Sequence, residues 1–206
     1  MIQSSPVCCL AFAGTRLIAS GDLRPVVFKA LAPTISDKLE PVLIFDDFTS
    51  EVIEIDLRGT PEDLLTRIGE IETGRPPSEE PILPEVGARG PGRPRLGVVA
   101  REVTLLPRHW DWLASQPGGA SAALRRLVET ARRTNQGRDR LRRAREAAYR
   151  FISAMAGNEP GFEEAARALF AGNQDRFEEL VGPWPVDVGN HAKKLAARAS
   201  EDEGFL

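Results

Sequence analysis

Arginine is the residue type whose number and spacing most suggest chemistry in this chain. Between Ala88 and Arg145 the sequence has 14 arginines, no lysine and four acidic residues, a net charge of +10. Residues 1–87 carry a net charge of −8, and residues 146–206 carry −5. Because guanidinium forks match phosphate oxygens and guanine edges, we expect a polyanion to bind the basic middle. The alternative is that the acidic flanks neutralise the middle within one fold.

Other side chains that often carry chemistry are too scattered to form a site. The two cysteines, Cys8 and Cys9, are adjacent on an expected strand, where neighbouring side chains point to opposite faces. The two histidines, His109 and His191, lie far apart, and we expect both on helix surfaces. No nucleophile elbow, phosphate-binding loop, dinucleotide fingerprint or zinc-protease motif occurs. We therefore predict that the chain is not an enzyme and has no catalytic residue, metal or cofactor.

Four acidic residues near the N-terminus could be mistaken for a metal or acid–base cluster. Asp46 and Asp47 lie in an expected turn, where Asp is favoured because it bonds the local backbone. Glu54 and Asp56 lie on the solvent side of a segment that alternates apolar and acidic residues. A structural role is expected for all four.

The overall fold class predicted is α+β, and residues 1–72 form its first domain, a small ββαββα unit. Thr60, Pro61 and Asp63 have the spacing of a helix N-cap, a first helical position and a capping box. The expected elements are strands at 7–13 and 16–19, a helix capped by Ser20 that ends before Pro33, strands at 41–45 and 51–57, and a helix after Thr60.

Residues 73–97 are rich in proline and glycine, which predicts a flexible linker. Its basic end contains Arg89, Arg93 and Arg95 in the sequence Arg-Gly-Pro-Gly-Arg-Pro-Arg. The Gly-Arg-Pro-Arg core resembles an AT-hook, which lies in the minor groove of A·T-rich DNA. A minor-groove arm, an arm that contacts phosphates nonspecifically and a plain linker remain open interpretations.

Residues 98–134 predict a third unit of one strand and two helices. The strand spans 98–106, Pro107 opens a helix that holds Trp110 in the core and Trp112 partly exposed, and a second helix follows a Gly-Gly break. Val103 to Pro107 and the helices after it resemble a ribbon-helix-helix domain. That resemblance implies a homodimer through residues 98–133 whose paired strands lie in the major groove. Independently, the second helix carries an apolar stripe for the dimer core, namely Ala123, Leu124, Leu127, Val128 and Ala131.

Candidate DNA contacts follow from this arrangement. Thr104 is the base-contact candidate of the strand, because its neighbours on the same face, Glu102 and Leu106, are unsuited to DNA. Ser121 is expected to cap the second helix and to leave backbone N–H groups pointing towards a phosphate. The remaining predicted contacts are arginines, expected to bind mainly the DNA backbone: Arg89, Arg93, Arg95, Arg101, Arg125 and Arg126.

The last predicted domain is helical and spans residues 138–200. A break at 134–137 precedes a long helix at 138–156, and three short helices at 162–171, 175–181 and 185–199 follow. Its expected core consists of Phe162, Ala166, Leu169, Phe170, Phe177, Leu180, Trp184 and Leu195.

The whole chain also resembles a bacterial family known as the domain of unknown function 2239. The stretches that carry the resemblance are residues 11–16, 18–23, 43–47, 56–59 and 162–184. The resemblance implies a bacterial cytoplasmic protein and assigns no activity or site residue. No run of 18 apolar residues and no signal peptide is present, so we expect a cytoplasmic protein that does not enter a membrane.

These observations predict a homodimeric protein that binds double-stranded DNA through its arginine-rich middle, and transcriptional regulation is the role that they suggest. The alternative is a protein-interaction or assembly module whose ribbon-helix-helix-like unit only dimerises. The sequence leaves open whether the first domain binds a small ligand or a protein partner.

Overall fold

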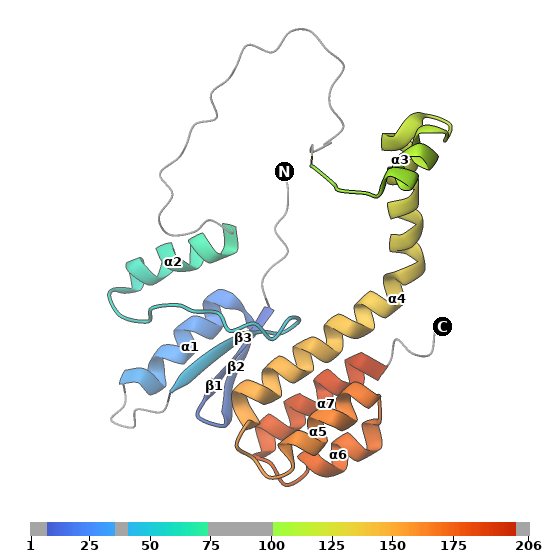
Figure 1. Cartoon of the computed structure of the whole chain (residues 1–206). Coiled ribbons are helices and arrows are strands. Elements are labelled where there is room, and N and C mark those ends of the chain that lie inside the picture. Colours follow the sequence, from blue (N-terminus) through green and yellow to red (C-terminus); the bar gives the residue numbers. More distant parts are fainter. Residues whose placement is uncertain (1–7, 36–40, 74–100, 201–206) are drawn as a thin grey trace. The chain divides into compact units, whose positions relative to one another are not determined.

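The computed structural model describes residues 8–35, 41–73 and 101–200. The chain divides into two compact units, of which the first comprises Met1–Ser78 with Gly137–Leu206 and the second comprises Glu79–Gln136. In the described residues it is an α+β protein with three strands and seven helices (Figure 1). None of the helices in these ranges combines the length and apolarity needed to cross a membrane.

The sheet of the first unit is antiparallel, with strand order β2-β1-β3. Its strands are β1, Cys8–Ala13, β2, Arg16–Asp22, and β3, Val42–Asp46. Because β1 is central and covered on both faces, it is apolar throughout instead of alternating. The predicted hairpin and third strand are confirmed.

Each face of β1 belongs to a different cluster of apolar side chains. Cys9 and Ala11 pack with residues of α1, Leu23–Ile35, and α2, Pro61–Thr73. Leu10 and Phe12 pack with Phe45 and with helices from the C-terminal part of the chain. Residues from both ends of the sequence thus share one core, an arrangement that the expectation of separate domains at 1–72 and 138–200 did not include.

The start of α1 differs from the prediction. Ser20 does not cap a helix, because β2 continues to Asp22 and Ser20 pairs with Leu10 in the sheet. The helix then begins at Leu23 and runs through Pro33 to Ile35. Pairing along the whole of β1 outweighs the local capping preference of one serine.

The predicted strand at 51–57 is wrong, so the expected ββαββα order becomes ββαβα. Only Val52 bridges to Phe45, and Ile53 N–H donates to the Ile44 carbonyl at 2.7 Å. The alternating pattern still has its expected effect, since Ile53, Ile55 and Leu57 pack against the α1–α2 cluster. An extended backbone is therefore enough to bury the apolar side chains on one side of this segment, without a complete ladder of strand hydrogen bonds.

The capping box of α2 is confirmed at atomic detail. Asp63 N–H donates to Thr60 Oγ1 at 3.2 Å, and Asp63 Oδ2 accepts from Thr60 N–H at 2.8 Å. The backbone and then the side-chain hydrogen bonds from Thr60 lower the pKa of the Asp63 carboxyl. The capping box thus provides hydrogen-bond acceptors for two backbone N–H groups at the helix start, those of Thr60 and Asp63.

The second unit contains α3, Pro107–Ala114, with proline at its first turn as predicted. Residues 101–106, the described part of the strand predicted at 98–106, form no strand. Trp110 is also not a core residue, because 40% of it is exposed. The predicted linker beyond residue 73, with Arg89, Arg93 and Arg95, lies outside the described residues.

Helix α4, Gly119–Ala156, begins in the second unit and continues into the first for 38 residues. The break predicted at 134–137 is therefore wrong. A single glycine costs only about 1 kcal/mol relative to alanine in a helix, and no proline interrupts the run. Ser121 is consequently inside the helix and not its N-cap.

The three short C-terminal helices are confirmed: α5, Phe162–Ala171, α6, Gln174–Val181, and α7, Val186–Ser200. Most of the expected core residues are buried or partly buried there, whereas Phe170 is exposed. His191, expected at the surface, is buried with 6% exposure. It lies between rings of the shared core, 4.6 Å from Phe151 and 6.2 Å from Phe12 by ring centroids.

Candidate anion-binding surfaces

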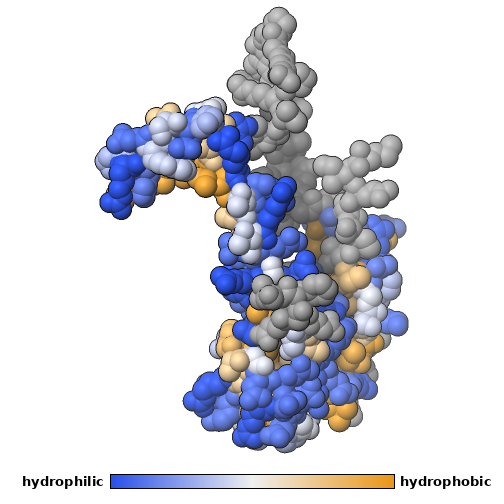
Figure 2. All heavy atoms as spheres, turned by 90° about the vertical axis from the view of Figure 1, so that its right-hand side faces the viewer, coloured by the Kyte–Doolittle hydropathy of each residue, from blue (hydrophilic) through white to orange (hydrophobic). Residues whose placement is uncertain are grey.

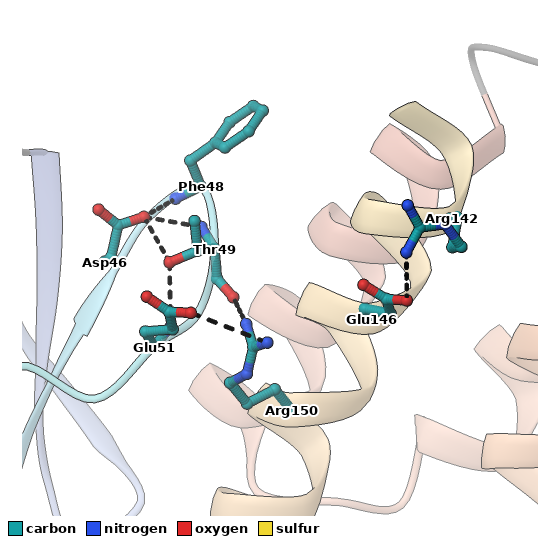
Figure 3. A network of polar contacts seen from close by, with 7 residues as sticks. All are labelled: Asp46, Phe48, Thr49, Glu51, Arg142, Glu146 and Arg150. Atoms are coloured by element: carbon teal, nitrogen blue, oxygen red, sulfur yellow. Dashed lines mark hydrogen bonds and ion pairs between the residues drawn. The ribbon is translucent and has the colours of Figure 1, made fainter. Parts of the chain in front are cut away.

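The turn after β3, residues 46–51, is held by its own side chains (Figure 3). Asp46 Oδ1 accepts from the Phe48 N–H at 2.9 Å, the Thr49 N–H at 2.7 Å and the Thr49 hydroxyl at 3.1 Å. Ser50 adopts a left-handed φ of 53°. Asp46 therefore has the turn-forming role that its sequence context predicts.

A side chain of helix α4 binds the same turn from one side. The Arg150 guanidinium donates to the Thr49 carbonyl, and its Nη2 lies 4.0 Å from Glu51 Oε1 (Figure 3). The backbone on the C-terminal side of Phe48 is thereby attached to a helix of the shared core.

Side chains of helix α7 bind the turn through hydrogen bonds and ion pairs with Asp47. Arg198 donates from Nη2 to Asp47 Oδ2 at 2.7 Å and from Nη1 to the Asp47 carbonyl at 2.5 Å. Lys194 Nζ lies 3.4 Å from Asp47 Oδ1. Partial burial would raise the pKa of the Asp47 carboxyl, but hydrogen bonding and charge from Arg198, and then Lys194, lower it below its ordinary value. Asp47 therefore fixes Arg198 in place.

A groove of about 340 Å³ lies beside this turn, within the first unit. Among the residues that the structure describes, its polar wall consists of Arg140, Arg143 and Arg198 and includes no acidic side chain. Its apolar wall is formed by Phe48, Ala144, Ala147 and Leu195. We call these seven residues the arginine groove.

The second unit carries a different set of arginines, on the first part of α4. Arg125 donates from Nε to the Ser121 carbonyl at 3.2 Å, and its Nη2 lies 3.4 Å from Ser121 Oγ. Arg126 Nη2 donates to the Pro117 carbonyl at 3.1 Å, which ties the α3–α4 loop to the helix. The structure thus brings Ser121 and Arg125 together and gives Arg126 a structural bond.

Two further arginines extend this surface, although sequence analysis did not select them. Arg132 and Arg133 follow Arg125 and Arg126 by seven residues, two helical turns, so the four lie on one side of α4. Glu129 lies 3.9 Å from Arg132 and 3.3 Å from Arg133. The seven-residue repeat of Arg-Arg pairs was the signal in the sequence.

Arg101 and Thr104 are exposed and belong to no helix or strand. Among the described residues, neither side chain forms a hydrogen bond or an ion pair with the α4 arginines. Arg89, Arg93 and Arg95 lie outside those residues, so their predicted roles stay predictions.

Phe48 and Arg198 were missed because no local pattern marks them as a site. A phenylalanine within the polar run Asp-Asp-Phe-Thr-Ser was the only hint, since its exposure costs hydrophobic free energy. Arg198 lies 150 residues further along the chain, and only the fold brings it to Asp47.

The titratable groups of the core are kept in their neutral forms. Burial, with nearby acidic groups, raises the pKa of the Cys9 thiol to about 12. Burial, followed by Lys194, lowers the pKa of His191 to about 4. Among the residues that the structure describes, no group of three or more His, Cys, Asp or Glu side chains could hold a metal ion.

The fold and surfaces together define an α+β protein with an exposed arginine face and a separate arginine groove. The chain belongs to the family described as uncharacterized proteins conserved in bacteria, DUF2239, whose model matches residues 8–196. No curated protein and no solved structure matched the chain.

Proposed function

We propose that this protein is a homodimer that binds double-stranded DNA through its arginine-rich middle, as a transcriptional regulator of a bacterial cell. The observation that carries the proposal is the exposed arginine face of the first part of α4, formed by Arg125, Arg126, Arg132 and Arg133. The proposal assigns no catalytic step and places the protein in the cytoplasm, where the bacterial chromosome lies.

Electrostatics support this choice of partner. The four arginines face one local carboxylate, Glu129, and the side chains of Arg132 and Arg133 stay 77% and 79% exposed beside it. Exposed ion pairs of this kind contribute only about 0–1 kcal/mol, so a phosphate can replace Glu129 at small cost. Arginines at two-turn spacing on a rigid helix can contact successive phosphates without ordering a loop.

The packing of the second unit supports the homodimer. Among residues 101–136 only Leu113 and Ala123 are buried, which is too little core for a unit of this size to be stable alone. The exposed apolar residues there are Val103, Leu106, Trp110, Trp112, Leu127 and Val128. Figure 2 shows such hydrophobic surface on the part of the chain that contains α3. A second copy presents the same apolar face and can cover this one symmetrically.

The ribbon-helix-helix arrangement forms the finer part of the proposal. A strand that pairs only with its copy in another chain has no partner within one chain, and Leu106 has extended backbone angles, φ −67° and ψ 149°. In this arrangement Thr104 contacts bases, Arg101 and Arg125 contact phosphates, and the arm with Arg89, Arg93 and Arg95 extends the contact.

The test is the binding of the full-length protein to random duplex DNA at a series of salt concentrations, measured by fluorescence anisotropy. Two copies present eight α4 arginines, so the affinity should fall roughly 10³- to 10⁵-fold between 50 and 200 mM salt. Arg125→Ala/Arg132→Ala and Arg93→Ala/Arg95→Ala should each weaken binding about tenfold or more and flatten the salt dependence.

The matched control is Arg167→Ala/Arg176→Ala, which removes two exposed arginines from α5 and α6 that pair with Glu164 and Glu179. It should bind DNA nearly as well as the unaltered protein. Absence of binding at low salt, or an equal loss in the control, would contradict the proposal.

The exposed apolar face also favours a second candidate, an assembly module in which the second unit only dimerises. A dimer in light scattering that binds no DNA would support this candidate over the first. A monomer would contradict both.

A further inference from the structure

We propose that the arginine groove of the first unit is a separate binding site for a nucleoside phosphate. The groove does not depend on the DNA-binding proposal, because the arginine face of that proposal lies on the second unit. Three features of the groove carry the inference: its charge, its aromatic edge and its size.

The charge of the groove selects an anion. Arg140, Arg143 and Arg198 line it, and no acidic side chain of the described residues does. Arg198 is held by Asp47 through two hydrogen bonds, which orders its guanidinium before any ligand arrives. Arg143 makes no hydrogen bond or ion pair with the described residues, so its donors are available. Preordered guanidinium groups bind phosphate oxygens with paired, charge-assisted hydrogen bonds.

The aromatic edge selects a ligand with a flat apolar part. Phe48 is 71% exposed, although hydrogen bonds and ion pairs hold the turn on both sides of it. Its ring is thus held in contact with water, which costs hydrophobic free energy. A flat partner stacked on the ring would remove that cost. Stacking of a nucleobase on such a ring contributes roughly 1–3 kcal/mol and tolerates different bases.

The size of the groove excludes several other occupants. Its volume of about 340 Å³ is near the lower end of the range of about 300–1,000 Å³ for small-ligand sites. A bare phosphate would leave the apolar wall of Phe48, Ala147 and Leu195 uncovered. A DNA duplex, whose major groove alone is about 12 Å wide, is much too large to enter. A phosphate joined to a base uses both walls at once.

The experiment is isothermal titration calorimetry of the full-length protein with ATP, adenosine and tripolyphosphate, at about 0.1 M salt and without magnesium. ATP should bind at least tenfold more tightly than either adenosine or tripolyphosphate, because only ATP reaches both walls. Arg143→Ala and Phe48→Ala should each weaken ATP binding about tenfold, the effect of losing one charged hydrogen bond or one stacked ring.

Arg167→Ala and Phe170→Ala are the matched controls, since they remove one exposed arginine and one exposed phenylalanine from α5. Arg143→Ala breaks no hydrogen bond or ion pair between described residues, so a folding defect is not expected, and circular dichroism checks this. Equal affinity for ATP and tripolyphosphate would show an anion site without a stacking base and would overturn the proposal. Equal affinity for ATP and adenosine, absence of ATP binding, or equal losses in the controls would also overturn it.

The DNA measurements distinguish the two proposals. Arg143→Ala and Phe48→Ala should retain the salt-dependent DNA binding of the unaltered protein, whereas Arg125→Ala/Arg132→Ala should retain ATP binding. If the groove variants lose both ligands to the same degree, the groove is part of the DNA surface and not a separate nucleotide site.

Discussion

His191 is a residue whose acid–base chemistry is changed by burial in the fold. Its ring lies among aromatic side chains of the shared core, and its Nε2 has no hydrogen-bond partner among the described residues. Burial and the charge of Lys194 lower its pKa to about 4, against the opposing effect of Asp47 and with a smaller contribution from Arg198. The neutral imidazole is therefore the form that the native state accepts.

This pKa predicts a pH dependence of folding stability. Since the folded value of about 4 lies below the ordinary 6.5, the unfolded chain binds a proton first as the pH falls. The contribution of His191 is complete above pH 6.5 and decreases by about 1.4 kcal/mol per pH unit as the pH falls towards 4. Urea unfolding at pH 7, 6 and 5 measures it.

His191→Leu should remove most of this dependence, because leucine has no proton to bind and suits the apolar site. The lowered pKa of Asp47 contributes only at lower pH, near and below its ordinary value of 3.8, so the two residues act in different ranges. An unchanged slope in His191→Leu between pH 7 and 5 would show that other groups cause it.

Helix α4 is the element that links the two kinds of arginine surface, because its first part belongs to the second unit and its second part to the first. Arginine is the commonest of its exposed residues, and its last turns supply Ala148, Phe151, Ile152 and Ala156 to the shared core. Packing of the apolar end supports the helix there, whereas the basic part depends on intrinsic helix propensity and local ion pairs.

The continuity of α4 at Gly137 can be tested by substitution. Gly137→Ala should raise the free energy of unfolding by about 0.4–1 kcal/mol, since alanine restricts the unfolded chain and favours the helix. Gly119→Ala is the contrasting variant, because Gly119 has a φ of +74° that alanine adopts only with strain. Thermal unfolding should show a rise for the first and a fall for the second. A fall for Gly137→Ala would indicate that the helix is interrupted there.

For the whole molecule, we propose that dimerisation is what the second unit requires. Its large apolar residues are mostly at the surface, and covering them releases water from apolar area at about 25 cal/mol per Å². The first unit has no such requirement, because both faces of its sheet are already covered.

A charge placed on this face should therefore dissociate the proposed dimer. Val128, 63% exposed on α4, and Val186, 74% exposed on α7, are matched positions in the single chain. Val128→Glu should shift the population towards monomer in analytical ultracentrifugation by about tenfold or more in dissociation constant, because it leaves an unpaired charge in the interface. Val186→Glu should not. Equal behaviour of the two variants would exclude this face from the interface.

Local signals in the sequence were sufficient for much of the fold. The hairpin of β1 and β2, the capping box of Thr60 and Asp63, and helices α5 to α7 depend on contacts between residues close in sequence. The clustering of arginines was equally visible, because charge is additive along the chain. The role of Asp46 in its turn also followed, since its bonds reach only two or three residues ahead.

Contacts between distant residues depended on the tertiary structure. Ser20 became part of a strand and His191 entered the core because strand pairing and packing with distant residues outweighed local preferences. Helix α4 continued through Gly137 because one glycine costs a helix only about 1 kcal/mol. The arginine groove has the same origin. Phe48, Arg143 and Arg198 come from a turn and two helices, and only the shared core of Phe12, Phe45 and Phe151 brings those elements together.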